Sequence, residues 1–393
     1  ARDLLTDDGV IFISIDDNEQ ENLKRVCDEI FGESNFVAQL IWEKKYTIAN
    51  DAKYFSDNHD YILCFAKNKE AFAIGKLPRT EEMNAAYKNP DNHPKGPWKA
   101  TPLHARSGSS SSANFSYTFK NGITFTPPTG RFSAYSEETL KAMDENNEIW
   151  FGKDGKSIPS RKTFLCDLKN DGVVPRTIIS YSEGGHNHEA DEEMKGLLKK
   201  KVFTSPKPSK LLHLLLTIGN VKNDSIILDF FSGSATTAHA VMQLNASTLQ
   251  HYWWLGNDIL KKQEAQGWGA KVIDMLSTDL MKRYGNDSGY SIRNLKYMRQ
   301  FAVEYPDFPF VQVPLAQLQD NQVLKSRLSK FTVTADGEFV QVPLAQITWY
   351  HHISMFPKVK DNILRAFYIT ESALQGWSRD IMLMQIEDGY HKK

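Results

Sequence analysis

The segment SIILDFFSGSATTAHAVM, Ser225 to Met242, is the stretch from which the fold can be inferred. Its apolar run from Ser225 to Phe230 predicts a strand, the small residues that follow predict a sharp turn, and Thr236 lies where a helix should begin. The first backbone N–H groups of a helix lack partners within it, so such a turn can receive a carboxylate or phosphate. Gly233 would let a ligand approach the backbone closely. The same pattern also occurs in ordinary strand-to-helix connections, so by itself it leaves the function open.

The N-terminal part of the chain also alternates between strand and helix patterns. Val10 to Ile15 is a short apolar run of the kind found in buried parallel strands. Asp16 to Phe31 carries the apolar stripe of a helix. Two further strand patterns follow, Phe36 to Trp42 and Tyr61 to Phe65. This order predicts an α/β layer whose strands are covered on both faces.

Residues 71–185 differ in character, because they are rich in Pro, Gly, Ser and aromatic residues. Their tryptophans and phenylalanines disfavour disorder, so we expect a loop-rich inserted domain. Helical pattern returns at Lys207 to Ile218 and dominates residues 247–393. The string FVQVPLAQ occurs twice, at Phe310 to Gln317 and Phe339 to Gln346, and we interpret it as a duplicated segment that flanks an insertion.

The composition is that of a globular protein of more than one domain. A chain of 393 residues exceeds the size of one usual core, and its net charge of -1 neither indicates nor excludes DNA binding. The three cysteines show no CxxC spacing, so we expect reduced, mostly buried thiols. No apolar run approaches the roughly 20 residues that cross a bilayer, and no signal peptide is recognisable, which predicts a cytoplasmic protein.

The details of Ser225 to Met242 resemble motif I of DNA amino-methyltransferases, in which an FxGxxT-type loop holds the methionine end of S-adenosylmethionine (S-adenosyl-L-methionine). The string SPKPSKLL, Ser205 to Leu212, resembles the motif X helix that helps to bind the same cofactor. Motif X directly before motif I is the order of the beta class, which includes the modification (Mod) subunits of type III restriction-modification systems. The residues that this resemblance implies for cofactor binding are Asp229, Phe231, Gly233, Ser234, Thr236, Lys207, Pro208 and Ser209.

The N-terminal part carries the resemblance further. The region around VIFISI resembles the strand and helix that follow the catalytic motif of this family, and HDYILCFAKN resembles motif VIII. The resemblance covers roughly residues 1–246 and implies part of a Rossmann-like methyltransferase sheet. We therefore predict a partial catalytic region at 1–70, a target-recognition-like insertion at 71–185, and the motif X and motif I region at 186–246. Double-stranded DNA, a restriction (Res) subunit and a second Mod chain are the implied partners.

Within the insertion, Trp98, Lys99 and Arg106 are candidate DNA contacts, although each one also fits an ordinary surface position. No catalytic residue can be assigned, because no DPPY- or NPPY-type string occurs in the sequence. Thr126 to Thr129 lacks the acid and the aromatic residue of such a loop, and we interpret it as a turn. We expect the catalytic loop to precede Ala1, and the strand with the acidic residue for the cofactor ribose to be missing after Asn245.

Residues 247–393 resemble a different family, the N-terminal domain of YhcG-type proteins, whose separate C-terminal domain resembles PDDEXK nucleases. The matching strings include HYWWLGNDILKKQEAQGWGAKVIDMLSTDLMKRYG and FYITESALQGWSRDIMLMQIEDGY. Helical patterns at Val272 to Tyr284 and after Ser291 predict a mainly α-helical, helix-turn-helix-like domain. Its second helix carries three basic residues at helical spacing, which form either a DNA-binding face or a solvated cationic surface: Arg293, Lys296 and Arg299.

His186 to Glu189, with the sequence HNHE, superficially resembles a metal or nuclease site. Adjacent residues do not by themselves form such a site, so we interpret this string as a loop that leads to the motif X helix. His351 and His352 are expected to pack on a helix face, and no metal site is predicted.

Two hypotheses for function follow. The first is a site-specific DNA adenine-N6 methyltransferase of the type III class that uses S-adenosylmethionine and is present as a fragment without its catalytic loop. The alternative is a catalytically inactive DNA-binding or interaction protein, formed by fusion of a methyltransferase remnant with a YhcG-like domain.

Overall fold

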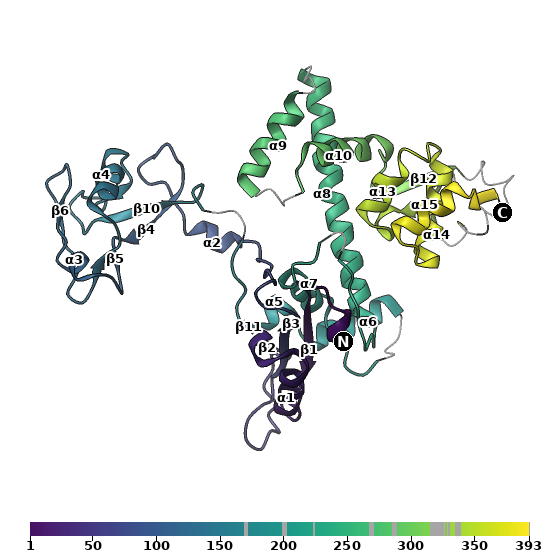
Figure 1. The fold of residues 1–393 in the computed structure, drawn as a ribbon, viewed down its shortest axis with the longest axis horizontal. Coiled ribbons are helices and arrows are strands. Elements are labelled where there is room, and N and C mark those ends of the chain that lie inside the picture. The colour runs from purple at the N-terminus through teal and green to yellow at the C-terminus, as the bar shows by residue number, and fades with distance from the viewer. Residues whose placement is uncertain are drawn as a thin grey trace. The chain divides into compact units, whose positions relative to one another are not determined.

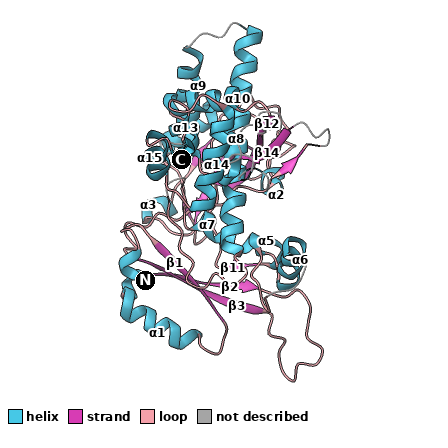
Figure 2. Cartoon of the chain, turned by 90° about the vertical axis from the view of Figure 1, so that its right-hand side faces the viewer, coloured by secondary structure: helices cyan, strands magenta, loops and turns pink. Residues whose placement is uncertain are grey.

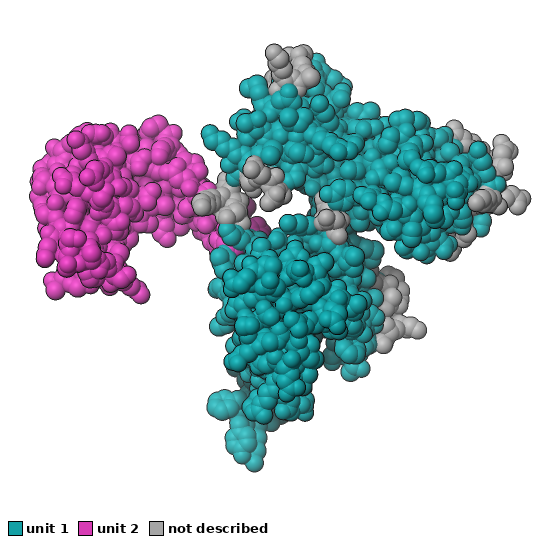
Figure 3. Space-filling view, in the orientation of Figure 1, with its two compact units in different colours: residues 1–77, 174–393 teal, residues 78–173 magenta. Residues whose placement is uncertain are grey.

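The computed structural model describes residues 1–168, 172–198, 203–222, 225–266, 271–284, 289–314, 326, 328, 331–334 and 339–392. These residues form two compact units. The first consists of Ala1–Leu77 together with Val174–Lys393, and the second is Pro78–Val173 (Figure 3). Each unit is described separately below.

A four-stranded sheet lies at the N-terminal end of the first unit, with the order β1-β3-β2-β11. Its strands are β1 (Val10–Ile15), β2 (Phe36–Glu43), β3 (His59–Ala66) and β11 (Ile178–Ile179). β3 pairs antiparallel with both β1 and β2, whereas β11 is parallel to β2. The short 3-10 helices η1 (Arg2–Leu4) and η2 (Glu33–Asn35) lie before β1 and β2.

Helices cover both faces of this sheet (Figure 2). On one face, Phe31 of α1 (Gln20–Phe31) packs with Leu63 and Phe65 of β3. On the other face, Ile62 of β3 packs with α7 (Ser209–Ile218). Alternate residues of β3 therefore face opposite helices, as the period of a strand requires. The predicted covering of the sheet on both faces is confirmed.

Three further helices connect the sheet to the C-terminal part of the chain. α5 (Tyr181–Gly184) follows β11, and α6 (Asn187–Leu198) precedes α7. α8 (Thr236–Gln266) is a single helix of 31 residues, which contacts α7 near its start and α10 farther along (Figure 1).

The C-terminal part packs around one large core that includes Phe301, Tyr305, Trp349 and Phe356. Its strand order is β12-β14-β13, and the two FVQVP copies pair antiparallel, Gln312 facing Gln341. The remainder of the first FVQVPLAQ copy lies outside the described residues. The elements of this part are α9 (Lys271–Tyr284), α10 (Ile292–Glu304), β12 (Phe310–Pro314), β13 (Thr332–Val333), β14 (Phe339–Pro343), η3 (Leu344–Gln346), α13 (Trp349–Met355), α14 (Asn362–Gln375), α15 (Arg379–Glu387) and η4 (Tyr390–Lys392).

The second unit has short elements around its own core of Leu103, Phe119, Phe125 and Leu140. It contains a sheet of order β4-β10-β9 and two small strand pairs, β5 with β8 and β6 with β7. Its elements are α2 (Glu81–Ala85), β4 (Trp98–Pro102), β5 (His104–Ala105), α3 (Ser110–Ala113), β6 (Tyr117–Thr118), β7 (Thr124–Phe125), β8 (Phe132–Ser133), α4 (Glu137–Glu145), β9 (Ile149–Trp150) and β10 (Ser160–Phe164).

Two expectations about strands are wrong. Val10–Ile15 is a strand, but it pairs antiparallel and is only partly buried. Residues 225–230 form no strand, and the side chain of Ile226 is 96% exposed. A strand needs a neighbour to satisfy its backbone groups, and no described strand pairs with this segment. The mixture of helices and strands agrees with the predicted fold class, while the Rossmann-like sheet remains a prediction.

Candidate functional site

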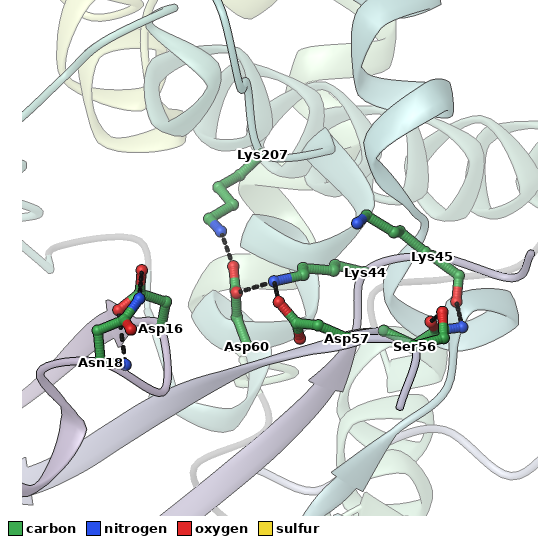
Figure 4. Close-up of polar contacts among 9 residues, drawn as sticks. Asp16, Asn18, Lys44, Lys45, Ser56, Asp57, Asp60 and Lys207 are labelled. Atoms are coloured by element: carbon green, nitrogen blue, oxygen red, sulfur yellow. Dashed lines mark hydrogen bonds and ion pairs between the residues drawn. The ribbon is translucent and has the colours of Figure 1, made fainter. Parts of the chain in front are cut away.

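A cluster of opposite charges joins the start of β3 to the residues just before α7 (Figure 4). The carboxylate of Asp60 lies between two ammonium groups. It accepts hydrogen bonds from Lys207 Nζ at 2.7 Å and from Lys44 Nζ at 2.8 Å. Lys44 also donates to the more exposed Asp57 at 3.1 Å. The segments that resemble motif VIII and motif X are therefore in direct contact through Asp60 and Lys207.

Each charged side chain of this cluster stabilises the charged form of its neighbour. Burial alone would raise the pKa of Asp60, but hydrogen bonds from Lys207 and Lys44 outweigh burial and lower that pKa below its ordinary value. Burial alone would lower the pKa of Lys44, but its bonds to Asp60 and Asp57 raise that pKa. Near pH 7 the Asp60 side chain is therefore a carboxylate and the Lys44 side chain an ammonium ion.

Trp42, which is fully buried near the end of β2, packs against this cluster through Lys207. The ammonium group of Lys207 lies 4.6 Å from the centre of its ring, a cation–π distance. Its indole Nε1 donates a hydrogen bond to the carbonyl of Gly185 at 2.9 Å. One aromatic side chain thus fixes both the Lys207 side chain and the connection between α5 and α6.

The other two motif X residues have structural surroundings that the sequence did not indicate. Pro208 is the N-cap of α7, and Ser209 is buried at its first position. Glu193 of α6 accepts hydrogen bonds from both the backbone N–H and the hydroxyl of Ser209, each at 2.9 Å. A carboxylate from another helix therefore satisfies the start of α7, where it also complements the helix dipole.

The motif I segment forms a tight turn into α8. Asp229 accepts hydrogen bonds from the backbone N–H of Phe231 at 3.0 Å and from the hydroxyl of Thr237 at 2.7 Å. The hydroxyls of Ser234 and Thr236 lie 2.7 Å apart. Asp229 therefore acts here as a local organiser of the turn.

Gly233 occupies a position that only glycine fits well. Its φ is 48°, and a Cβ atom there would lie 3.1 Å from the ring of Phe203. The turn and the first N–H groups of α8 provide donors for a carboxylate, which fits the methionine end of S-adenosylmethionine. The exposed ring of Phe231 leaves this side of the turn open to solvent.

The three predicted DNA contacts of the second unit do not share one environment. Lys99 and Arg106 are exposed. Trp98 is buried, and its Nε1 donates to Asp91 at 2.8 Å, while the buried Lys162 lies 5.5 Å from its ring. Contrary to the prediction, the side chain of Trp98 belongs to the core of this unit.

In the C-terminal part the two helices of the predicted helix-turn-helix are present as α9 and α10. Ser291 caps α10 by accepting a hydrogen bond from the backbone N–H of Asn294, as predicted. The turn residues 285–288 lie outside the described residues, and α10 packs mainly along α8. The three basic residues predicted to contact DNA are all exposed on α10: Arg293, Lys296 and Arg299.

Within the part of the chain that the structure describes, no group of three or more His, Cys, Asp or Glu side chains could hold a metal ion. The rings of His186 and His188 lie parallel, with their centres 6.3 Å apart. His352 is fully buried and His351 partly buried, which matches the packing role expected for them. Cys27 and Cys64 are buried, Cys166 is exposed, and all three are free.

Sequence reasoning did not identify Asp60, Lys44 or Glu193. Asp60 lies within the HDYI string that resembles motif VIII, so that string pointed to the right segment without indicating its partner. Lys207 lies 147 positions away from Asp60 in the sequence.

Among the described residues, no helix is both long enough and apolar enough to cross a membrane.

Comparison with known proteins follows the same division of the chain. A family model described as DNA methylase matches residues 1–268, and the DUF1016 N-terminal domain matches residues 234–393. The two matches overlap at residues 234–268, most of which lie in α8. The second match supports the resemblance to the YhcG-type N-terminal domain.

Curated relatives agree with the first match. The Type III restriction-modification enzyme StyLTI Mod subunit of Salmonella typhimurium (strain LT2) is 39% identical over 251 residues, 62% of this chain and 36% of that protein. The EcoPI Mod subunit of Escherichia phage P1 is 36% identical over 272 residues, 62% of this chain and 41% of that protein. The Type II methyltransferase M.EcaI of Enterobacter cloacae is 30% identical over 260 residues, 64% of this chain and 51% of that protein. The chain thus spans about a third to a half of the length of these relatives.

Proposed function

Because this chain belongs to the DNA methylase family, we propose that it binds S-adenosylmethionine and double-stranded DNA for site-specific adenine-N6 methylation of the type III class. The contact between Asp60 and Lys207 carries this proposal, since it joins two segments that are far apart in the sequence. Both segments resemble motifs of one methyltransferase domain, and α7 in turn contacts α8, the helix that follows the motif I turn.

In this proposal the motif I turn holds the cofactor by its charged methionine end. The backbone N–H groups at the start of α8 and the hydroxyls of Ser234 and Thr236 would bind the carboxylate. Lys207, Pro208 and Ser209 would act from the start of α7, with Ser209 in a positioning role because Glu193 already occupies its hydroxyl. When bound, the cofactor supplies the methyl group.

Calorimetry with S-adenosylmethionine on the purified chain tests this site. We expect micromolar binding, about -8 kcal/mol, that is lost in Gly233→Asp because the new side chain brings a negative charge and bulk into the turn. Gly155→Asp is the matched control, since Gly155 also has a positive φ and a Cβ atom added there would meet nothing within 4 Å. Absence of binding by the unmodified chain, or equal binding by both variants, would contradict the assignment.

The remaining family expectations enter as parts of the same proposal. Residues 71–185 would recognise the target sequence, with Lys99 and Arg106 as DNA contacts, while residues 1–70 and 186–246 form the methyltransferase region. A Res subunit and a second Mod chain are the proposed protein partners. Methylation of cytosine, instead of adenine, by an enzyme that contains this chain would contradict the proposed chemistry.

A second function, DNA binding through the C-terminal part, is favoured by one observation. α10 presents three exposed basic side chains in the part of residues 247–393 that matches DUF1016. If all three contact phosphates, replacing Arg293, Lys296 and Arg299 with alanine should lower the slope of log affinity against log salt by up to about 3.

The two functions are separated by measuring methyl transfer directly. Incorporation of labelled methyl groups into duplex DNA by this chain alone would exclude a function limited to DNA binding. Duplex binding that is unchanged in the triple alanine variant would remove α10 as the DNA-binding face.

A further inference from the structure

Four ring side chains gather at the end of β2, and we call this surface the aromatic shelf. It consists of Tyr46, Tyr181, His186 and His188. The Tyr46 ring lies 4.7 Å from that of His186 and 5.9 Å from that of Tyr181, centre to centre. His186 in turn lies parallel to His188. The shelf therefore brings together residues from the β2–β3 loop, α5 and the start of α6.

The backbone beneath the shelf is held by specific hydrogen bonds. The N–H of Asn187 donates to the carbonyl of Lys44 at 3.0 Å, and the N–H of Tyr181 donates to the Glu43 carboxylate at 3.1 Å. His186 Nδ1 accepts a hydrogen bond from the N–H of Glu189 at 3.1 Å. These contacts hold the backbone of the segments that carry Tyr181, His186 and His188.

The rings remain accessible even though they touch one another. Tyr46 is 52% exposed and Tyr181 43% exposed. Lys45, which precedes Tyr46 in the sequence, is also exposed. The preceding residue, Lys44, belongs to the Asp60 cluster. Exposed rings together with an exposed cation on an adjacent residue can bind unpaired nucleotides, by stacking on the base and attraction of the phosphate.

We propose that the aromatic shelf binds an unpaired nucleotide of DNA, with the base packed against the exposed rings of Tyr46 and Tyr181, which are tilted by 48° to one another, and with Lys45 near a phosphate. This inference rests on the proposed function, because an enzyme that acts on a base must first take it out of the stack. Duplex DNA buries its base faces and would leave the rings unused.

Fluorescence anisotropy with the complete chain and two labelled oligonucleotides tests the proposal. One probe is a single-stranded oligodeoxythymidine, and the other is an abasic strand of the same length. We expect the first to bind more tightly. Tyr46→Ala and Tyr181→Ala should each weaken its binding about fivefold or more, with little change for the abasic strand. Lys45→Ala should weaken both probes alike.

Matched variants keep the result interpretable. Tyr46→Phe keeps the ring and should retain affinity, which separates stacking from misfolding. Tyr350→Ala removes a tyrosine of similar exposure, 38%, from α13 and should have no effect. Equal binding of the two probes, or unchanged binding in both shelf tyrosine variants, would overturn the proposal.

The same proteins are also titrated with S-adenosylmethionine, so that failure of the proposed function is recognised separately. Loss of cofactor binding with base-dependent binding intact would reject the methyltransferase proposal and leave the shelf standing. Cofactor binding without base-dependent oligonucleotide binding would reject the shelf alone.

Discussion

Replacing Asp60 with asparagine would leave two ammonium groups facing a neutral side chain. The side chains of Asp60 and Lys44 are only 13% and 12% exposed, so neither can be rehydrated without rearrangement. Lys207 is 33% exposed and has more access to water. The substitution keeps the volume of the side chain almost unchanged, so its effect reports mainly the loss of charge.

The size of the effect follows from these exposures. Breaking a buried ion pair costs about 3–5 kcal/mol, whereas an exposed pair contributes about 0–1 kcal/mol. Lys44 retains its bond to Asp57, which is 67% exposed, and the amide oxygen of asparagine can still accept one hydrogen bond. We therefore expect Asp60→Asn to reduce the free energy of unfolding by about 2–3 kcal/mol at pH 7.

Hydrogen exchange by mass spectrometry can localise this loss. Amides of β3 and α7 should exchange faster in Asp60→Asn, because the variant weakens the contact between the start of β3 and the residues before α7. A double-mutant cycle with Lys207→Met isolates the pair, with an expected coupling of about 1–2 kcal/mol. Asp16→Asn is the matched control, since Asp16 is exposed and its carboxylate accepts hydrogen bonds from its close neighbour Asn18 (Figure 4).

The pH dependence has a definite sign. The pKa of Asp60 is lowered in the folded chain relative to its ordinary value of 3.8. Its contribution is therefore complete above about pH 4 and is lost as the pH falls through the lower, folded value. The difference between the unmodified chain and Asp60→Asn should shrink over that range. Additive effects in the cycle, or a difference that persists unchanged at pH 3, would refute the reasoning.

Two further predictions concern the C-terminal part. Gly256→Ala should destabilise the packing of α8 on α10 by about 1–3 kcal/mol, because its Cβ would lie 2.0 Å from the carbonyl oxygen of Met298. Gly196→Ala is the control, because a Cβ atom there meets nothing within 4 Å, and it should be neutral or slightly stabilising in thermal unfolding. If Gly256→Ala and Gly196→Ala changed the stability equally, this account would be contradicted. Burial lowers the pKa of His352 to about 3, so stability should fall as the pH drops from 6.5 and the unfolded chain alone gains the proton. His352→Gln should reduce that slope by up to about 1.4 kcal/mol per pH unit in denaturant titrations, and an unchanged slope would show that other groups cause it.

Local sequence patterns predicted those elements whose sequence signals lie within the element or directly beside it. Ser291 before an amphipathic run correctly indicated the start of α10, and the apolar stripe after Lys207 correctly indicated α7. Both signals rest on side chains within a few positions of one another. The apolar run Val10–Ile15 likewise indicated a strand, but a strand's direction depends on its partner, and that partner, β3, begins more than forty positions later.

The candidate site was harder to predict because its contacts join distant segments. Nothing near Asp60 in the sequence indicates that its carboxylate meets Lys207. Trp98 illustrates the opposite error, since a tryptophan among basic residues suggested a surface contact. In the structure, Asp91 satisfies its indole N–H and the ring is buried. Whether such a residue faces DNA or a core depends on tertiary packing, which composition does not encode.

The change of family along the chain coincides with a continuous element of structure. α8 begins with Thr236 of the motif I turn and runs without interruption past Asn245, where the sequence resemblance changes. The Asn245 side chain donates hydrogen bonds to the backbone carbonyls of Ala345 at 2.8 Å and Ile347 at 2.9 Å. A flexible linker would let the two parts of the chain fold independently. Here they share one helix, α8, which packs against both α7 and α10, so each part stabilises the other. A substitution in the motif I turn therefore also alters the start of α8, and α8 contributes side chains to the C-terminal core.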